Sequence, residues 1–283
     1  GLGYESVKAF AEKGAEVVLA SRSIEKGEVA KEEILNVNHK AKVKVMELDL
    51  MDLSSVQKFS ERFKEKYERL DVLLNNAGIM FSPYFLTKDG FEAQMGTNHL
   101  GHFALTAHLL DMIVKTNNSR VVNVSSNAHK WGKMDFNNFL FENGKEYTPI
   151  KSYSRSKLAN LLFSYELQRR FEKYDTNCIA VAAHPGSSQT NLVRYVDNKT
   201  LFKTFKPLLM LMTQDQEQGA LPQIRASVDP KINGAKYYGP NGFGEMKGAP
   251  VLVKSSEASH NVDDAKKLWN LSENLTGLSF NFR

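Results

Sequence analysis

The chain has 283 residues, of which 42% are hydrophobic and 24% charged, a composition that excludes a disordered protein and allows one large α/β core. The net charge of +5 comes from lysine and glutamate mixed along the same segments, which argues against nucleic-acid binding and fits a phosphate-rich small molecule. No apolar run reaches the roughly 18 residues that a transmembrane segment needs, and the single cysteine, Cys178, excludes an internal disulfide, so we expect a soluble cytoplasmic protein.

Strand and helix patterns alternate along most of the chain. Short runs rich in Val, Ile and Leu predict strands buried on both faces, at 16–20, 43–48, 72–75, 121–125 and 178–183. Amphipathic patterns predict helices at 3–12, 24–36, 53–67, 91–115 and 152–174, and a strand at 235–238 and a helix at 262–275 close the chain. This alternation predicts a doubly wound parallel sheet, a Rossmann fold, in a single domain over 1–283.

The alternation weakens after residue 191. The segment 201–212 gathers Leu, Phe and Met around Pro207, and we interpret the region 191–230 as an apolar lid over a substrate. A core-packing helix explains the same residues equally well, because Leu and Met at helical spacing usually indicate packing.

The chain opens on Gly1-Leu2-Gly3, directly before a predicted helix. Glycines there let the backbone approach the pyrophosphate of a dinucleotide at the helix N-terminus. The next strand runs into Ser21-Arg22 without an acidic residue, and an arginine at this point accommodates the 2′-phosphate of NADP. We therefore expect NADP (NADPH) and regard NAD as the less favoured cofactor. The alternative is a surface arginine that caps a strand.

Polar and small residues follow the next two strands. Asp49 and Leu50 come after the second strand, and Asn75, Ala77 and Gly78 after the third. The carboxyl ends of parallel strands form the ligand-binding edge of an open sheet, so we expect these residues to contact the cofactor, with Asp49 near the adenine amino group. Ordinary turn chemistry explains them equally well.

Five tyrosines are followed by a lysine four residues later, so this spacing alone identifies nothing; they are Tyr4, Tyr84, Tyr147, Tyr153 and Tyr195. Only Tyr153 opens a long helix away from the phosphate end, with Ser152 as a candidate N-cap. Positions i and i+4 place its phenol beside the ammonium of Lys157, whose charge would stabilise a phenolate. A contact on the helix surface is the alternative.

Further candidates follow the last two strands of this series. Ser126 emerges at the ligand edge, where its hydroxyl can hydrogen-bond a reacting carbonyl oxygen. We choose it over Ser125 because strand residues alternate in direction, although Ser125 stays open. Pro185 and Gly186 end the fifth strand, and Thr190 follows where a hydroxyl could hold a nicotinamide amide.

Two histidines, His99 and His102, lie three apart on a predicted helix. A metal site would need a third ligand, and no carboxylate or cysteine shares their pattern. We therefore expect them to be structural and predict no metal.

In chain order, the motifs Gly-x-Gly, Asn-Asn-Ala-Gly, Asn98-His-Leu-Gly-His, Asn-Val-Ser-Ser, Tyr-x-x-x-Lys and Pro-Gly resemble those of the short-chain dehydrogenase/reductases. The likeness covers nearly the whole chain, and the runs 98–103, 128–129 and 156–160 are most similar to the retinol dehydrogenase-like branch. The resemblance implies a seven-stranded parallel sheet and a catalytic tetrad, which maps onto Asn98, Ser126, Tyr153 and Lys157.

The resemblance also implies a role for each tetrad residue. Tyr153 is the general acid for carbonyl reduction and the base for alcohol oxidation. Lys157 also holds the nicotinamide ribose and Ser126 orients the substrate, while Asn98 organises a water that relays protons to Lys157. The hydride belongs to the cofactor.

Two segments differ from compact family members. The family's usual start, a strand followed by Thr-Gly-x-x-x, does not precede Gly1, so we expect an N-terminal segment to be missing. Residues 127–149 form an insertion whose aromatic residues predict an apolar pocket, or else pack against each other; they are Trp131, Phe136, Phe139 and Phe141.

The sequence therefore predicts an NADP(H)-dependent oxidoreductase that interconverts a small hydrophobic alcohol and its aldehyde or ketone. The alternative is a catalytically silent nucleotide-sensing or interaction protein on the same fold. The residues do not distinguish a monomer from a homo-oligomer.

Overall fold

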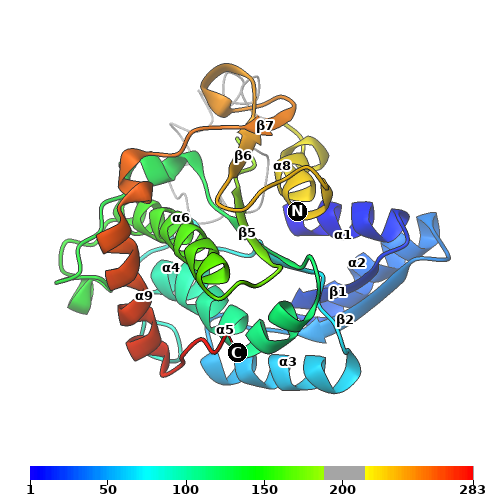
Figure 1. Ribbon diagram of the computed structural model, residues 1–283, viewed down its shortest axis with the longest axis horizontal. Helices are drawn as coiled ribbons and strands as arrows, with labels where there is room; N and C mark the ends of the chain where they lie inside the picture. The colour runs from blue at the N-terminus through cyan, green and yellow to red at the C-terminus, as the bar shows by residue number, and fades with distance from the viewer. Residues whose placement is uncertain (188–213, 283) are drawn as a thin grey trace.

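The computed structural model describes residues 1–187 and 214–282, and its strands lie between helices on both sides (Figure 1). Within these residues the strands are β1 Glu16–Ser21, β2 Lys42–Glu47, β3 Val72–Asn75, β4 Arg120–Val124, β5 Ile179–Ala183, β6 Tyr237–Pro240 and β7 Pro250–Leu252. β1 pairs with β2 in one parallel sheet, and β3 to β7 form a second sheet in chain order. The predicted doubly wound α/β fold is thus confirmed.

The expectation of one seven-stranded parallel sheet is wrong in two respects. The described strands form two sheets, of two and five strands, and no ladder joins β1 to β3. β7 runs antiparallel to β6, because the short connection between them, 241–249, allows a hairpin but not the crossover that a parallel pair requires.

The α-helices of the described residues mostly agree with the predicted ranges. They are α1 Leu2–Glu12, α2 Ile24–Val37, α3 Leu53–Lys66, α4 Ala93–Met95, α5 Gly101–Lys115, α6 Pro149–Lys173, α8 Gln216–Val228 and α9 Val262–Thr276. A π-helical turn, Gly96–Leu100, joins α4 to α5. The pattern did not predict α8, because Gly219 and Pro222 inside it read as helix breakers.

The strands of the larger sheet are apolar on both faces, as their unbroken hydrophobic runs predict. In β4, Val121 belongs to the core beneath α3, α5 and α6, whereas its neighbour Val122 packs on the opposite face with Ala226 of α8. Figure 1 shows α3, α5 and α6 on one side of this sheet and α8 on the other. The carboxyl ends of β3, β4 and β5 are therefore held in a rigid, two-sided core.

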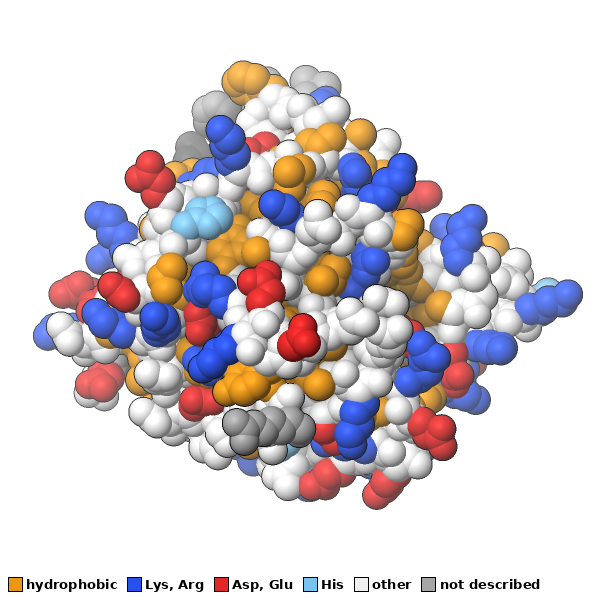
Figure 2. Space-filling model, viewed as in Figure 1, with side chains coloured by type: hydrophobic (Ala, Val, Ile, Leu, Met, Phe, Trp, Pro, Cys, Tyr) orange, Lys and Arg blue, Asp and Glu red, His pale blue; other side chains and the backbone are white. Residues whose placement is uncertain are grey.

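The surface mixes charges as the sequence does. Figure 2 shows lysines and arginines interspersed with acidic side chains over the face in view. Among the described residues, no helix is both long enough and apolar enough to cross a membrane.

Helix α6 begins earlier than the sequence pattern indicates. Thr148 is its N-cap and accepts a hydrogen bond from the backbone N–H of Lys151, while Pro149 occupies the first turn. Proline suits that position because its missing N–H would have no partner there. The prediction that Ser152 caps the helix is therefore wrong, and Tyr153 lies in the second turn. Ser152 instead donates a hydrogen bond of 2.6 Å to the buried carboxylate of Glu92.

The insertion 127–149 is fastened to α6 by Arg155. Its guanidinium donates hydrogen bonds to three carbonyls of the insertion, at residues 133, 138 and 139, and lies 4.0 Å from the ring centroid of Phe141. Phe139 and Phe141 are buried, and Phe136 stacks on Phe139. These phenylalanines thus pack against one another and against α6, and they do not line an apolar pocket. Trp131, in contrast, is 69% exposed.

His99 and His102 are buried where the π-helical turn meets α5. The Nε2 of His99 lies 2.9 Å from the hydroxyl of Ser272 on α9, and the Nδ1 of His102 lies 3.1 Å from the carbonyl oxygen of Asn98. Burial lowers the pKa of His99 to about 3 and that of His102 to about 4. Both imidazoles are therefore neutral at physiological pH and serve as hydrogen-bonding core residues.

These two histidines predict a loss of stability in mild acid. Below a pH of about 6.5 the unfolded chain protonates them, whereas the folded chain does not until their pKa values of about 3 and about 4 are reached. The free energy of unfolding should therefore fall by about 1.4 kcal/mol per pH unit for each histidine between about pH 6 and 4.5, and level off above about pH 7.

Urea unfolding across this pH range measures the slope. His102→Gln should reduce it by about 1.4 kcal/mol per pH unit relative to the wild-type chain. The matched control is His39→Gln, which changes an exposed histidine in a turn. Equal slopes for the two variants would contradict the assignment.

Candidate active site

The predicted site residues gather where β3, β4 and β5 end. These strands are parallel neighbours, with Asn75 opposite Asn123 and Val124 opposite Ala183. The segments that follow them therefore lie side by side along one edge of the sheet. Helix α6 packs against β4, β5 and the short 3-10 helix Asn127–Trp131 that follows β4, which brings Tyr153 and Lys157 to the same edge.

Tyr153 and Lys157 form a buried pair on α6. Both residues are nearly inaccessible, and the Nζ of Lys157 lies 5.7 Å from the centroid of the Tyr153 ring. The ring of Phe81 meets the Tyr153 ring edge-on, with 5.3 Å between the two ring centroids. The ammonium of Lys157 donates a hydrogen bond of 3.0 Å to the carbonyl oxygen of Val124, at the end of β4.

Burial dominates the titration of this pair. It raises the pKa of Tyr153 to about 12, with the nearby hydroxyl of Ser126 acting in the opposite direction, and lowers the pKa of Lys157 to about 8. We expected the ammonium of Lys157 to lower the pKa of the phenol, but in this structure it is directed at the Val124 carbonyl and desolvation prevails. Near pH 7 the phenol therefore carries a proton that it can donate.

The two serines after β4 differ in their surroundings, as alternation along the strand predicts. Ser125 is buried and donates a hydrogen bond of 2.8 Å to the backbone carbonyl of Lys157. Ser126 is half-buried, and its hydroxyl accepts a bond from the N–H of Ala128 while lying close enough to Tyr153 to affect its pKa. Ser125 thus fastens the strand to α6, and Ser126 is the serine beside the phenol.

His129, which the sequence analysis did not single out, supports Ser126. Its Nδ1 donates to the carbonyl oxygen of Ser126 over 2.7 Å, and its Nε2 accepts from the N–H of Ser256 over 3.0 Å. Burial lowers the pKa of His129 to about 4, so this neutral tautomer persists at physiological pH. The signal in the sequence was a histidine three residues after Ser126, but its partner Ser256 is distant along the chain.

Asn98 joins the segment after β3 to helix α6. Its amide oxygen accepts from the N–H of Ile79 over 2.8 Å, and its amide nitrogen donates to the Ile79 carbonyl and to the hydroxyl of Ser156. Ser156 precedes Lys157, so the asparagine holds the turn of α6 that carries the lysine. The backbone carbonyl of Asn98 accepts a hydrogen bond from the Nδ1 of His102 over 3.1 Å.

Gly78 allows these groups to come together. A Cβ atom at this position would lie 2.9 Å from the Oδ1 of Asn98 and 3.6 Å from the Nζ of Lys157. The neighbouring Ala77 is exposed at the same edge. Asn75, in contrast, is buried and donates to Thr106 and Asn123, so its amide nitrogen is used within the protein.

The residues assigned to the phosphates lie at the start of α1. Gly1 is the N-cap and is exposed, and it caps the helix without a side chain. Gly3 packs against the segment after β3, since a Cβ there would lie 2.8 Å from the Nδ2 of Asn76. A helix N-terminus without a side-chain cap, beside a close glycine contact, fits the pyrophosphate of a dinucleotide.

Arg22 follows Ser21, the last residue of β1, and is exposed. Its Nη1 lies 3.9 Å from the Sδ of Met51, so the guanidinium spans the carboxyl ends of β1 and β2. Asp49, after β2, accepts a hydrogen bond of 3.0 Å from the N–H of Met51, and Leu50 is buried next to it. The guanidinium is thus accessible at the edge where the sequence predicts the adenosine end of the cofactor.

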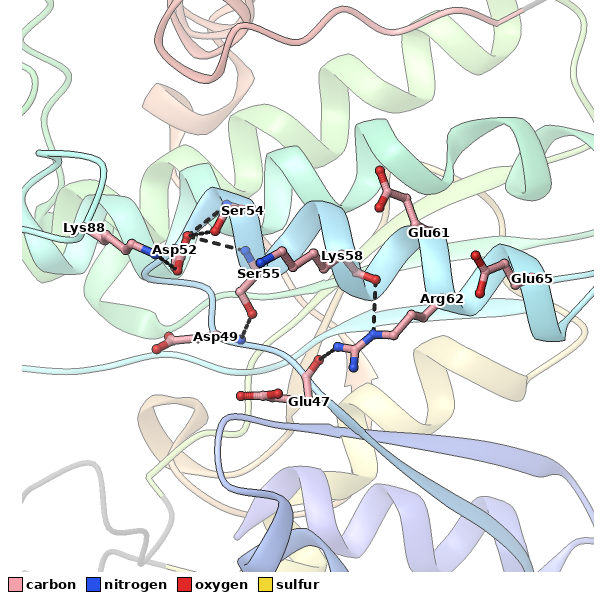
Figure 3. Close-up of a pocket in the computed structure, with 10 residues that line it drawn as sticks. All are labelled: Glu47, Asp49, Asp52, Ser54, Ser55, Lys58, Glu61, Arg62, Glu65 and Lys88. Carbon is pink, nitrogen blue, oxygen red and sulfur yellow. Dashed lines mark hydrogen bonds and ion pairs between the residues drawn. The ribbon is translucent and has the colours of Figure 1, made fainter.

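A polar hollow of about 460 Å³ lies on the α3 side of Asp49 (Figure 3). Its lining is entirely polar or charged and consists of Glu47, Asp49, Asp52, Ser54, Ser55, Lys58, Glu61, Arg62, Glu65 and Lys88. Asp52 is paired with Lys88 at 2.6 Å, and this bond is the main cause that lowers the pKa of Asp52 to about 2. The hollow includes neither Tyr153 nor Ser126, so it does not suit an apolar substrate of that pair.

The segment after β5 turns sharply at Gly186. The residue has a φ of +66°, and its N–H donates to the Nδ1 of His184 over 3.2 Å. A Cβ at Gly186 would lie 2.3 Å from the carbonyl oxygen of Met246, so only glycine fits the turn after Pro185. Thr190 and the segment 201–212 lie outside the described residues, and their roles stay predictions. The lid prediction is wrong for 216–228, because these residues form α8, whose Ala226 packs in the core against the sheet.

The sequence of this chain is similar to a known family and to curated proteins. A sequence profile described as short chain dehydrogenase matches residues 1–200. The chain is 38% identical over 278 residues to retinol dehydrogenase 11 of Homo sapiens, covering 98% of this chain and 83% of that protein. It is 41% identical over 240 residues to retinol dehydrogenase 14 of Homo sapiens, covering 83% and 67%.

Solved structures share the fold. A crystal structure of a protein from Mycobacterium paratuberculosis has a TM-score of 0.81 at 39% identity, covering 99% of this chain and 91% of that one. The Pseudomonas aeruginosa protein RhlG, solved in complex with NADP, has a TM-score of 0.65 at 18% identity, covering 84% and 89%. At that identity the second match supports the fold alone.

Proposed function

This chain belongs to the short-chain dehydrogenase family, whose members are oxidoreductases of alcohol and carbonyl groups that bind nicotinamide cofactors, and on this premise we propose a specific reaction. The protein interconverts a hydrophobic alcohol and its aldehyde or ketone with NADP(H). The observation that carries the proposal is the buried Tyr153–Lys157 pair beside the Ser126 hydroxyl.

The proton side of the reaction belongs to three residues of the chain. The phenol of Tyr153 keeps its proton near neutral pH and donates it to the carbonyl oxygen during reduction. The hydroxyl of Ser126, held by His129 through its backbone, donates a hydrogen bond to the same oxygen. Lys157 supplies a positive charge that compensates the phenolate left behind. NADP(H), when bound, carries the hydride.

Asn98 holds this constellation together in the proposal. It joins Ile79 to the helical turn before Lys157. In the proposal it also organises a water that relays protons to Lys157, the role that the family resemblance implies. In oxidation the phenolate of Tyr153 accepts the proton of the alcohol, and the relay through Lys157 and the water at Asn98 carries that proton on to solvent.

The preference for NADP rests on Arg22 and on the absence of a carboxylate at the tip of β1. An exposed guanidinium there can form charge-assisted hydrogen bonds with a 2′-phosphate. The hydrophobic nature of the substrate rests on the relatives named retinol dehydrogenases and on Phe81, whose ring lies against Tyr153. The cytoplasmic location stays a prediction.

Replacing Tyr153 with phenylalanine tests the role of the phenol. Turnover of apolar aldehydes should fall about 10²- to 10⁴-fold because the proton donor is lost. NADPH binding, followed by fluorescence titration, should stay within about threefold because the ring is retained. The control Tyr174→Phe removes the hydroxyl of a tyrosine near the end of α6 that stacks on Phe282. Near wild-type turnover in Tyr153→Phe would refute the mechanism.

Replacing Arg22 with aspartate tests the cofactor. The aspartate should repel a 2′-phosphate and accept a bond from a ribose hydroxyl, so Kd should rise at least about tenfold for NADPH and fall for NADH. The control Lys26→Asp makes the same charge change on the exposed start of α2. Unchanged affinities for both cofactors in Arg22→Asp would overturn the NADP assignment.

A further inference from the structure

The carboxylate of Glu245 contacts both segments that flank the candidate active site. One oxygen lies 3.3 Å from the Nζ of Lys130, on the 3-10 helix that Ser126 caps. The other lies 3.0 Å from the Nε2 of His184, which begins the segment of Pro185 and Gly186. His184 is fully buried, whereas the carboxylate side chain is 24% exposed. Glu245 thus bridges the segment after β4 and the segment after β5.

The protonation of His184 suits this bridge. The N–H of Gly186 donates to its Nδ1, so that nitrogen is an acceptor and the proton of the neutral ring lies on Nε2. This Nε2 is 3.0 Å from the carboxylate oxygen, an electrostatic contact that is not aligned as a hydrogen bond. Burial lowers the pKa of His184, and contact with the imidazole is the main cause that lowers the pKa of Glu245. The ring also packs closely against β6, where a Cβ at Gly239 would be 1.9 Å from Nε2.

The backbone around Glu245 is bent into an unfavourable conformation to make these contacts. Gly244 has a φ of 60° and Glu245 a φ of 56°, the left-handed region that a residue with a Cβ seldom adopts. Such a conformation persists only where the surroundings impose it. Here the amide of Asn127 donates to the carbonyl of Gly244, and the N–H of Ser187 donates to the carbonyl of Met246. The backbone carbonyls of Gly244 and Met246 and the side chain of Glu245 therefore contact the same two segments, the one after β4 and the one after β5.

We propose that Glu245 is a positioning residue that fixes the distance between Ser126 and the Pro185–Gly186 segment. This inference rests on the proposed function, in which Ser126 orients the carbonyl, and on the prediction from the sequence that Pro185 and Gly186 contact the cofactor. Hydride and proton transfer need both reactants aligned, and a misplacement of about 1 Å can slow a reaction about 10²-fold. Glu245 touches neither reactant and acts through Lys130 and His184.

Glu245→Gln removes the charge of the bridge and keeps its shape. The rate constant of a single turnover, measured by stopped flow with preformed enzyme–NADPH complex and excess apolar aldehyde, should fall at least about tenfold. The Kd for NADPH should stay within about threefold. A purely structural role would instead lower the amplitude of the turnover through loss of folded protein and leave its rate constant unchanged.

The matched control is Glu146→Gln. Glu146 is an exposed glutamate with the same left-handed backbone, at a φ of 57°, outside the candidate site. Its variant should retain the wild-type rate constant. Lys130→Met removes only the more exposed arm of the bridge and should give a smaller decrease than Glu245→Gln.

Hydrogen exchange tests the bridge independently of catalysis. In Glu245→Gln, exchange should accelerate at least about threefold in peptides covering 127–130 and 184–187, and not in Glu146→Gln. Unchanged exchange in these peptides, or an unchanged single-turnover rate constant in an active enzyme, would overturn the inference. If the wild-type protein neither binds NADPH nor reduces any aldehyde while exchange still accelerates, the bridge stands and the proposed function fails.

Discussion

A buried ammonium, which needs hydrogen-bond acceptors in place of the water it has lost, organises the whole site. Lys157 lies on α6 beneath the edge of the sheet, and a cation in such a place is tolerated only with polar partners. It finds one in the carbonyl of Val124, which also accepts from the amide of Asn160. Ser125 completes the junction by donating to the carbonyl of Lys157. Three hydrogen bonds thus fix the end of β4 against one turn of α6.

The chemistry of the site follows from this junction. With the strand and helix in register, Tyr153 lies one helical turn before Lys157 and Ser126 emerges directly beyond Ser125. Desolvation raises the pKa of the phenol to about 12 and lowers that of the lysine to about 8. Since both values lie above neutral pH, both groups hold their protons there. The remaining segments are fastened to the same centre, the one after β3 by Asn98 and the one after β5 through Glu245.

The sequence predicted those parts of the structure that depend on local patterns. Strands buried on both faces read as unbroken apolar runs, so β1 to β5 lie within a residue or two of their predicted ranges. The start of α6 was misplaced because Pro149 looks like a break and is in fact a first-turn residue. The choice of Ser126 over Ser125 agrees with their placement, because alternation along a strand is also a local property.

Contacts between distant segments could not be predicted in this way. His129 depends on Ser256, and Glu245 depends on His184 and Lys130, pairs that no periodicity connects. The effect of Lys157 on the phenol was also misjudged, since spacing places two side chains on one face but does not indicate how deeply they are buried.

In the proposed mechanism Tyr153 donates the proton, and the positive charge of Lys157 compensates the phenolate that remains. The most direct measurement is the rate constant of NADPH oxidation by an apolar aldehyde as a function of pH, in single turnovers of the wild-type protein. We expect the rate constant to be independent of pH near neutrality and to decrease as Lys157 loses its proton at a pH of about 8. A rate that rises through this pH range would contradict this mechanism.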